Sequence, residues 1–194
     1  MKKISIFILC LCLFLVACSN EVEKVDGQTN SEKTEKSILS LVKEINNYEA
    51  NKDYTQAIEV YEELGDLTNN NYEKEKGRLK EKEKAYKNDI RIVNEIKEHF
   101  DEALFNPESL QLHKIYIDKS SIEDEDYKIF IDYSAMNKMG GFAREYLDWD
   151  VKNNVLQNFT QIDAEQFKQY MDINRKYNSN SDSYEFDKSL IKDL

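Results

Sequence analysis

The chain has 194 residues and a formal net charge of −11, and 34% of its residues are charged. Phosphates of nucleic acids and anionic lipid headgroups repel such an acidic chain, so we expect neither nucleic-acid binding nor electrostatic attachment to a membrane. The three cysteines, Cys10, Cys12 and Cys18, all lie close to the N-terminus.

The first eighteen residues have the layout of an export signal. Two lysines precede an uncharged apolar run from Ile4 to Val16, and a small alanine stands directly before Cys18. The sequence Leu15-Val16-Ala17-Cys18 closely resembles the lipobox of bacterial lipoproteins. This resemblance implies that residues 1–17 are removed as a signal peptide. It also implies that the Cys18 thiol receives a diacylglycerol and that acyl chains such as palmitate anchor the protein.

Two other interpretations of this segment are a membrane-spanning anchor that is not cleaved and an ordinary secretory signal. The apolar run has about thirteen residues, fewer than the roughly 20 that a helix needs to cross a bilayer. The lipoprotein interpretation places the protein on the outer face of a bacterial plasma membrane, with the lipid bilayer as its first partner. Cleavage would also remove Cys10 and Cys12, so we expect no intramolecular disulfide.

Residues 18–35 are polar and predict a flexible tether behind the lipidated cysteine. A helical region is predicted over residues 36–105. Its first helix carries one apolar stripe at helical spacing, formed by Ile38, Leu41, Val42, Ile45 and Tyr48. A second helix is predicted from Tyr54 to Leu64, with Asp53 as its N-cap and Gly65 as the residue that ends it.

The two helices together are similar to one tetratricopeptide repeat, on the residues Asn51, Asp53, Tyr54, Ala57, Ile58, Tyr61 and Leu64. In that family a small residue lets two helices approach while tyrosines fill the groove between them. Lys52 stands where the repeat usually has glycine, and the likeness covers about thirty residues once, whereas repeat arrays need about three units. The segment is therefore either a helical hairpin with repeat-like packing or a truncated peptide-binding module.

One long helix is predicted between Asn70 and Leu104. Its first half has a thin, coiled-coil-like stripe with a seven-residue spacing, so we expect it to pack on the hairpin. Its second half is richer in apolar residues, namely Ile90, Val93, Ile96, Phe100 and Leu104, and is expected to reach the next domain. Pro107 ends the helix, because the residue before a proline is disfavoured in helical conformation.

A small α+β domain is predicted over residues 106–177. Four strands are expected, at residues 110–117, 126–133, 142–149 and 155–159, followed by a covering helix whose Phe167, Tyr170 and Met171 face the sheet. Residues 178–194 are predicted to be a polar tail, in which Leu190 and Ile191 have the character to dock. The fold class is therefore α+β: an N-terminal helical hairpin with a long helix, like a three-helix bundle, followed by a small antiparallel sheet with a covering helix.

The segment that starts at Asn106-Pro107-Glu108-Ser109-Leu110 and ends with residues 137–146 resembles a C-terminal region of assorted small bacterial lipoproteins and secreted proteins. That region has no assigned activity, so the resemblance implies a module and no chemistry. Within it, four residues have two open interpretations: a tight turn that fixes strand register, or a ligand site built from Asn137, Gly140, Gly141 and Arg144.

The sequence predicts no cofactor and no metal site. His99 has no Cys or Glu at metal-ligand spacing, and the acidic run from Glu123 to Asp126 lacks the glycine and spacing of a calcium loop. There is no nucleophile elbow. We therefore expect a non-enzymatic lipoprotein that binds another envelope or secreted protein. The alternatives are an envelope hydrolase that acts on cell-wall material and an inhibitory or immunity lipoprotein.

Overall fold

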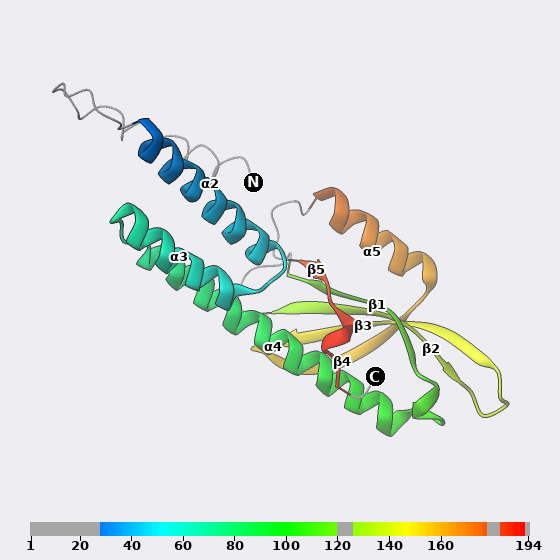
Figure 1. Ribbon diagram of the computed structural model, residues 1–194. Helices are drawn as coiled ribbons and strands as arrows, with labels where there is room; N and C mark the ends of the chain where they lie inside the picture. Colours follow the sequence, from blue (N-terminus) through cyan, green and yellow to red (C-terminus); the bar gives the residue numbers. More distant parts are fainter. Residues whose placement is uncertain (1–27, 120–125, 178–182, 193–194) are drawn as a thin grey trace. The chain divides into compact units, whose positions relative to one another are not determined.

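A computed structural model describes residues 28–119, 126–177 and 183–192 (Figure 1). The predicted α+β class is confirmed: three consecutive helices precede an antiparallel sheet of five strands, with a further helix after the fourth strand. The chain divides into two compact units, and the boundary between them lies within a helix, after Lys84. The lipobox and Cys18 lie outside the described residues, so their role stays a prediction.

The first unit contains α2 (Gln28–Ala50), α3 (Tyr54–Thr68) and the beginning of α4 (Glu73–Ala103). Helices α2 and α3 form the expected hairpin, and its core is made of Leu41 and Ile45 from α2 with Val60 and Leu64 from α3. Ala57 has no exposed surface, as expected for a small residue that lets helices approach closely. The start of α4 joins this unit through two hydrogen bonds between the Arg78 guanidinium and Glu49.

Two predicted boundaries in this unit are wrong. The helix begins at Gln28, whereas the tether was expected to extend to residue 35. Gln, Glu and Lys favour helices, so a helix nucleated by the apolar stripe extends back across them. Helix α3 also continues past Gly65 and ends at Asn69, whose backbone is left-handed with φ of 53°. A glycine lowers helix stability by only about 1 kcal/mol, which the packing of Leu64 offsets.

The turn between α2 and α3 confirms the predicted cap and holds Lys52 in a left-handed conformation. The Asp53 carboxylate accepts a hydrogen bond of 3.3 Å from the Gln56 amide, as an N-cap residue does. Lys52, which stands where the repeat usually has glycine, has φ of 61°. This left-handed conformation is the one that glycine adopts most readily.

The second unit is built around the sheet, whose strand order is β4-β3-β2-β1-β5. The first four strands form an antiparallel meander, and the fifth returns to pair with the first. Their bounds are β1 (Gln111–Asp118), β2 (Tyr127–Met136), β3 (Phe142–Lys152), β4 (Val155–Ile162) and β5 (Tyr184–Glu185), and short 3-10 turns are at Pro107–Ser109 (η1) and Lys188–Leu190 (η2).

Helices cover both faces of this sheet (Figure 1). The alternation predicted for β2 is confirmed, because Tyr127, Ile129, Ile131 and Tyr133 all lie in the core under the second half of α4. Phe130, which lies between Ile129 and Ile131 in the sequence, faces the opposite side of the sheet. It packs there against Phe167 and Met171 of α5 (Ala164–Tyr177). Tyr170 of α5 stacks on Phe130, with the two ring centroids 4.8 Å apart.

The C-terminal segment differs from the polar tail that was expected. Tyr184 and Glu185 pair with β1, while Phe186 and Ile191 are 2% and 6% exposed and belong to the main core. Leu190, the other residue expected to dock, remains 38% exposed. The domain boundary differs too: residues 85–105 belong with the sheet, because the apolar second half of α4 forms one wall of its core.

Among the described residues, no helix combines the length and the apolar character that a membrane-spanning segment requires.

Candidate functional site

The turn between β2 and β3 contains three of the four predicted site residues, and its geometry supports the interpretation as a turn. The Asn137 side-chain oxygen accepts hydrogen bonds from the amides of Met139 and Gly141 at 3.0 and 3.1 Å. Gly140 has φ of 81°, a conformation that side chains disfavour. These contacts close the hairpin and engage the Asn137 side-chain oxygen.

Arg144 lies on β3, beyond the turn, and its guanidinium is already engaged. It donates two hydrogen bonds, of 2.8 and 2.7 Å, to the two carboxylate oxygens of Asp132 on the neighbouring strand. This bond to the carboxylate raises the pKa of Arg144. Asp132 is only 5% exposed, so the pair neutralises a buried charge rather than presenting a free cation.

A buried polar cluster, centred on Asp89 of α4, lies where α4, β1, β2 and β5 meet. One Asp89 oxygen accepts hydrogen bonds from the Lys119 ammonium at 2.6 Å and from the Tyr184 hydroxyl at 2.8 Å. Burial raises the pKa of both Tyr127 and Tyr184, and the negative charge of the nearby Asp89 carboxylate raises it further. Asp89 is 1% exposed, so this cluster belongs to the interior of the fold and is closed to a large ligand.

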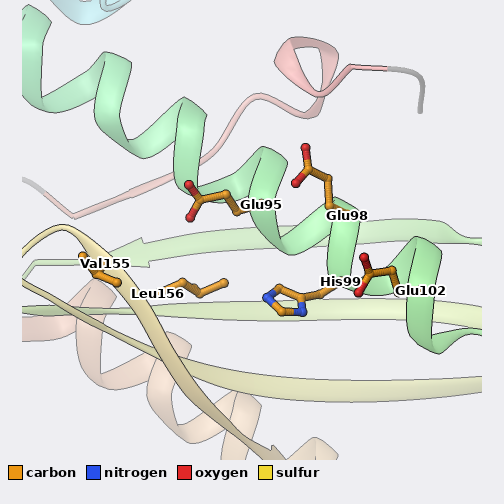
Figure 2. Close-up of a pocket in the computed structure, with 6 residues that line it drawn as sticks. All are labelled: Glu95, Glu98, His99, Glu102, Val155 and Leu156. Carbon is orange, nitrogen blue, oxygen red and sulfur yellow. The ribbon is translucent and has the colours of Figure 1, made fainter.

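A groove of about 240 Å³ runs between α4 and β4 (Figure 2). Three carboxylates project from successive turns of α4, and the His99 ring points towards Leu156 on the opposite side. We call this surface the acidic groove; its lining residues are Glu95, Glu98, His99, Glu102, Val155 and Leu156. Glu95 pairs with Arg91, whereas Glu98 and Glu102 make no ion pair with any described residue.

Two aromatic side chains, Trp149 and Phe159, lie behind His99, which lines the acidic groove; we call these two side chains the aromatic floor. The indole of Trp149, which is 3% exposed, lies beneath His99 at a ring separation of 5.5 Å. Phe159 of β4 covers the same indole at 4.8 Å and is itself 55% exposed. Val155, Leu156 and Phe159 therefore form an apolar strip on β4, whereas the carboxylates come from α4.

The outer sides of β1 and β4 differ in whether another segment pairs with them. The edge of β1 is covered by the C-terminal segment: Phe186 donates a backbone hydrogen bond to Ile115, and the Lys188 ammonium donates to the Leu112 and His113 carbonyls. Within the described part of the chain, β4 pairs only with β3, and no segment pairs with its outer edge. The first two residues of β4, Val155 and Leu156, line the acidic groove.

Two features that the sequence analysis weighed as metal sites are His99 and the acidic run at Glu123–Asp126. His99 is at the surface, where its ring contacts Trp149. Of the acidic run at Glu123–Asp126, only Asp126 is described, and its carboxylate accepts a hydrogen bond from the Asn153 amide. Across the residues that the structure describes, no group of three or more His, Cys, Asp or Glu side chains is arranged to hold a metal ion.

Comparison with protein-family models, with curated proteins and with solved structures finds no match for this chain. The resemblances to a lipobox, to a tetratricopeptide repeat and to a C-terminal lipoprotein region therefore stay predictions. The acidic groove was not predicted from the sequence. Its one local signal is the spacing of Glu95, Glu98 and Glu102 on a single helix face, which is common in a chain this acidic.

Proposed function

We propose that the protein is a lipoprotein of the bacterial cell envelope, anchored through acylated Cys18, and that it acts by binding another envelope or secreted protein. The observation that carries the binding role is the open edge of β4 beside the acidic groove. An unpaired strand edge next to an apolar strip is a surface that natural proteins normally cover or use for recognition. The anchoring role is carried by the sequence Leu15-Val16-Ala17-Cys18.

The geometry of the groove favours binding over hydrolysis of cell-wall glycan. Glycosidases place two carboxyl groups on opposite sides of the bond that is cleaved. In the acidic groove all three carboxylates come from α4, while the β4 side contributes Val155 and Leu156. A row of carboxylates on one wall suits a cationic partner that lies along the groove.

The anchoring is tested by mass spectrometry of the product purified from membranes. The proposal requires a chain that begins at Cys18 and carries acyl chains, and a Cys18→Ala variant that is released from the membrane. An unmodified thiol on the native product would contradict it.

The binding role is tested by photo-crosslinking in intact cells. A photoreactive phenylalanine analogue is placed at Phe159, with Phe105 as the matched control, since the two side chains are 55% and 63% exposed in the same unit. We expect a discrete crosslinked protein from position 159 and none from position 105. Equal crosslinking at both positions, or none at 159, would overturn the assignment of the binding surface.

A further inference from the structure

We infer that the acidic groove and the outer edge of β4 together accept an extended, basic segment of the partner, which adds to the sheet as a further strand with Lys or Arg at alternate positions. This inference rests on the proposed function and names the chemistry of its partner. It depends on three separate features of the second unit: the backbone of β4, the aromatic floor and the carboxylates of α4.

The backbone of β4 leaves one stretch suited to strand addition. Trp149 is opposite Phe159 and Val151 is opposite Leu156, so β4 carries a bulge at residues 157–158. Before the bulge, the Gln157 side-chain amide donates to the carbonyls of Val155 and Leu156 at 3.2 and 3.3 Å. The outer edge from Asn158 to Ile162 remains, long enough for an added strand of about five residues.

The aromatic floor supplies the apolar part of the recognition. Phe159 lies on Trp149, and more than half of its surface is exposed. In an added strand, alternate side chains point to the same face of the sheet. The aliphatic stems of Lys or Arg side chains on the α4 side would cover Phe159 and remove its ring from water.

The carboxylates set the charge of the partner. Glu98 and Glu102 are exposed and have no ion-pair partner among the described residues, whereas Arg91 already neutralises Glu95. Four helical residues rise about 6 Å. Two residues of a strand span about 6.8 Å. Basic side chains at positions i and i+2 of the added strand therefore have nearly the same spacing as Glu98 and Glu102.

The same charges argue against a second copy of this chain as the occupant. Pairing β4 with β4 of another copy would bring two acidic grooves together on chains that each carry a net charge of −11. Like charges placed side by side disfavour such a complex. A basic extended segment has the complementary charge.

The test uses the full-length chain in nanodiscs of zwitterionic phosphatidylcholine, which does not attract cations. The probe is a fluorescent, acetylated and amidated peptide of about seven residues in which Lys and Val alternate, and binding is followed by fluorescence anisotropy. A Glu98→Gln/Glu102→Gln variant removes the two free carboxylates. Glu59→Gln/Glu63→Gln is the matched control, because it removes two exposed carboxylates with the same spacing from α3.

We expect saturable binding that weakens about fivefold or more in the Glu98/Glu102 variant and less than twofold in the control. The same peptide with alternate backbone amides methylated should also bind more weakly, because it cannot donate to the edge of β4. Equal weakening in the two variants would show attraction by net charge alone and would overturn the inference. Equal binding of the methylated peptide, or no saturable binding, would overturn it too.

This result is separable from the proposed function. Photo-crosslinking at Phe159 that persists in the Glu98→Gln/Glu102→Gln variant would leave a protein-binding role in place while rejecting a basic strand as its ligand. Loss of crosslinking in that variant, together with the peptide result, supports both.

Discussion

Lys52 is held in a backbone conformation that favours glycine, at the turn between α2 and α3. A left-handed residue with a β-carbon is strained by roughly 1 kcal/mol or more, and glycine relieves this at some cost in the entropy of the unfolded chain. We therefore expect Lys52→Gly to raise the free energy of unfolding by about 0.5–1 kcal/mol, measured by circular dichroism at 222 nm in urea.

The matched control for this position is Lys52→Ala. It removes the same lysine contacts but keeps the β-carbon, so it should not stabilise the chain. Equal urea midpoints of unfolding for the Lys52→Gly and Lys52→Ala variants would show that backbone strain at this residue has no measurable effect on stability.

Asp89 is a buried acid whose charge is balanced by one lysine. Replacing Lys119 by methionine leaves the Asp89 carboxylate, which is 1% exposed, without a counter-charge. Removing one partner of a buried ion pair typically costs about 3–5 kcal/mol of unfolding free energy. The chain has one tryptophan, Trp149, and it lies in the core of the second unit, so its fluorescence reports this loss in a urea titration.

The double variant Asp89→Asn/Lys119→Met separates charge from packing. Asparagine keeps an acceptor for the Tyr184 hydroxyl and needs no counter-charge. The double variant should therefore be more stable than Lys119→Met alone. A double variant less stable than the single one would show that the charge of Asp89 is not the source of the loss.

Some individual residues could be assigned from sequence and others could not. Asp53 was predicted as a cap because its partner is three residues away, and Asn137 was predicted as a turn residue for a similar local reason. The pairing of Asp132 with Arg144 joins residues whose closeness depends on strand register. Asp89 meets Tyr184 across 95 positions, and no local pattern reveals such a contact.

The C-terminal segment is an integral element of the sheet, and a pair of substitutions tests this. Phe186 is 2% exposed, so Phe186→Ala should cost about 3–5 kcal/mol of unfolding free energy, because it removes a buried ring and leaves a cavity. Leu190→Ala, four residues away and 38% exposed, should cost much less. Trp149 fluorescence in urea measures both, and equal effects would contradict the assignment of Phe186 to the core.

At the scale of elements, the sequence predicted the long, periodic ones best. The stripe from Ile38 to Tyr48 and the alternation in β2 are repeated signals, and both elements are present. β5 has only two residues, too few to show an alternation of apolar and polar side chains, so the sequence predicted a polar tail there. The β3–β4 turn is shorter than expected because Asn153 and Asn154 adopt φ of 50° and 59°, which permits a tight two-residue hairpin.

At the scale of the whole molecule, the candidate site follows from strand order. A meander of four strands would leave both β1 and β4 open. The return of β5 replaces the β1 edge with a strand of only two residues, so β4 is the longer open edge of the described sheet. That return depends on residues far apart in the chain. The acidic groove also requires α4 to lie beside β4. Tertiary packing determines this placement, and no local sequence pattern predicts it.

Buried tyrosines make the second unit sensitive to alkali. Burial raises the pKa of Tyr127, Tyr133 and Tyr184 above 10.0, and nearby carboxylates add to the effect. Above pH 10 the unfolded chain loses these protons before the folded chain does, so the free energy of unfolding should fall as the pH rises. The urea midpoint from Trp149 fluorescence should be lower at pH 11 than at pH 8.

Tyr133→Phe provides the comparison for this pH dependence. The Tyr133 hydroxyl donates to Glu145 at 2.7 Å, and its loss should lower stability at pH 8 but make the decline between pH 8 and 11 shallower. An unchanged slope would indicate that other groups cause the alkaline loss.

The late return of residues 184–191 to β1 also constrains how the second unit forms. β1 ends at Asp118, yet the residues that protect its outer side and complete the hydrophobic interior, Phe186 and Ile191, follow more than sixty positions later. A chain that emerges in sequence order, from a ribosome or through a translocation pore, exposes an incomplete interior until those residues appear. Acquisition of the native state by this unit is therefore postponed until residues 184–191 have emerged, and a chaperone has a long interval in which to hold the polypeptide extended.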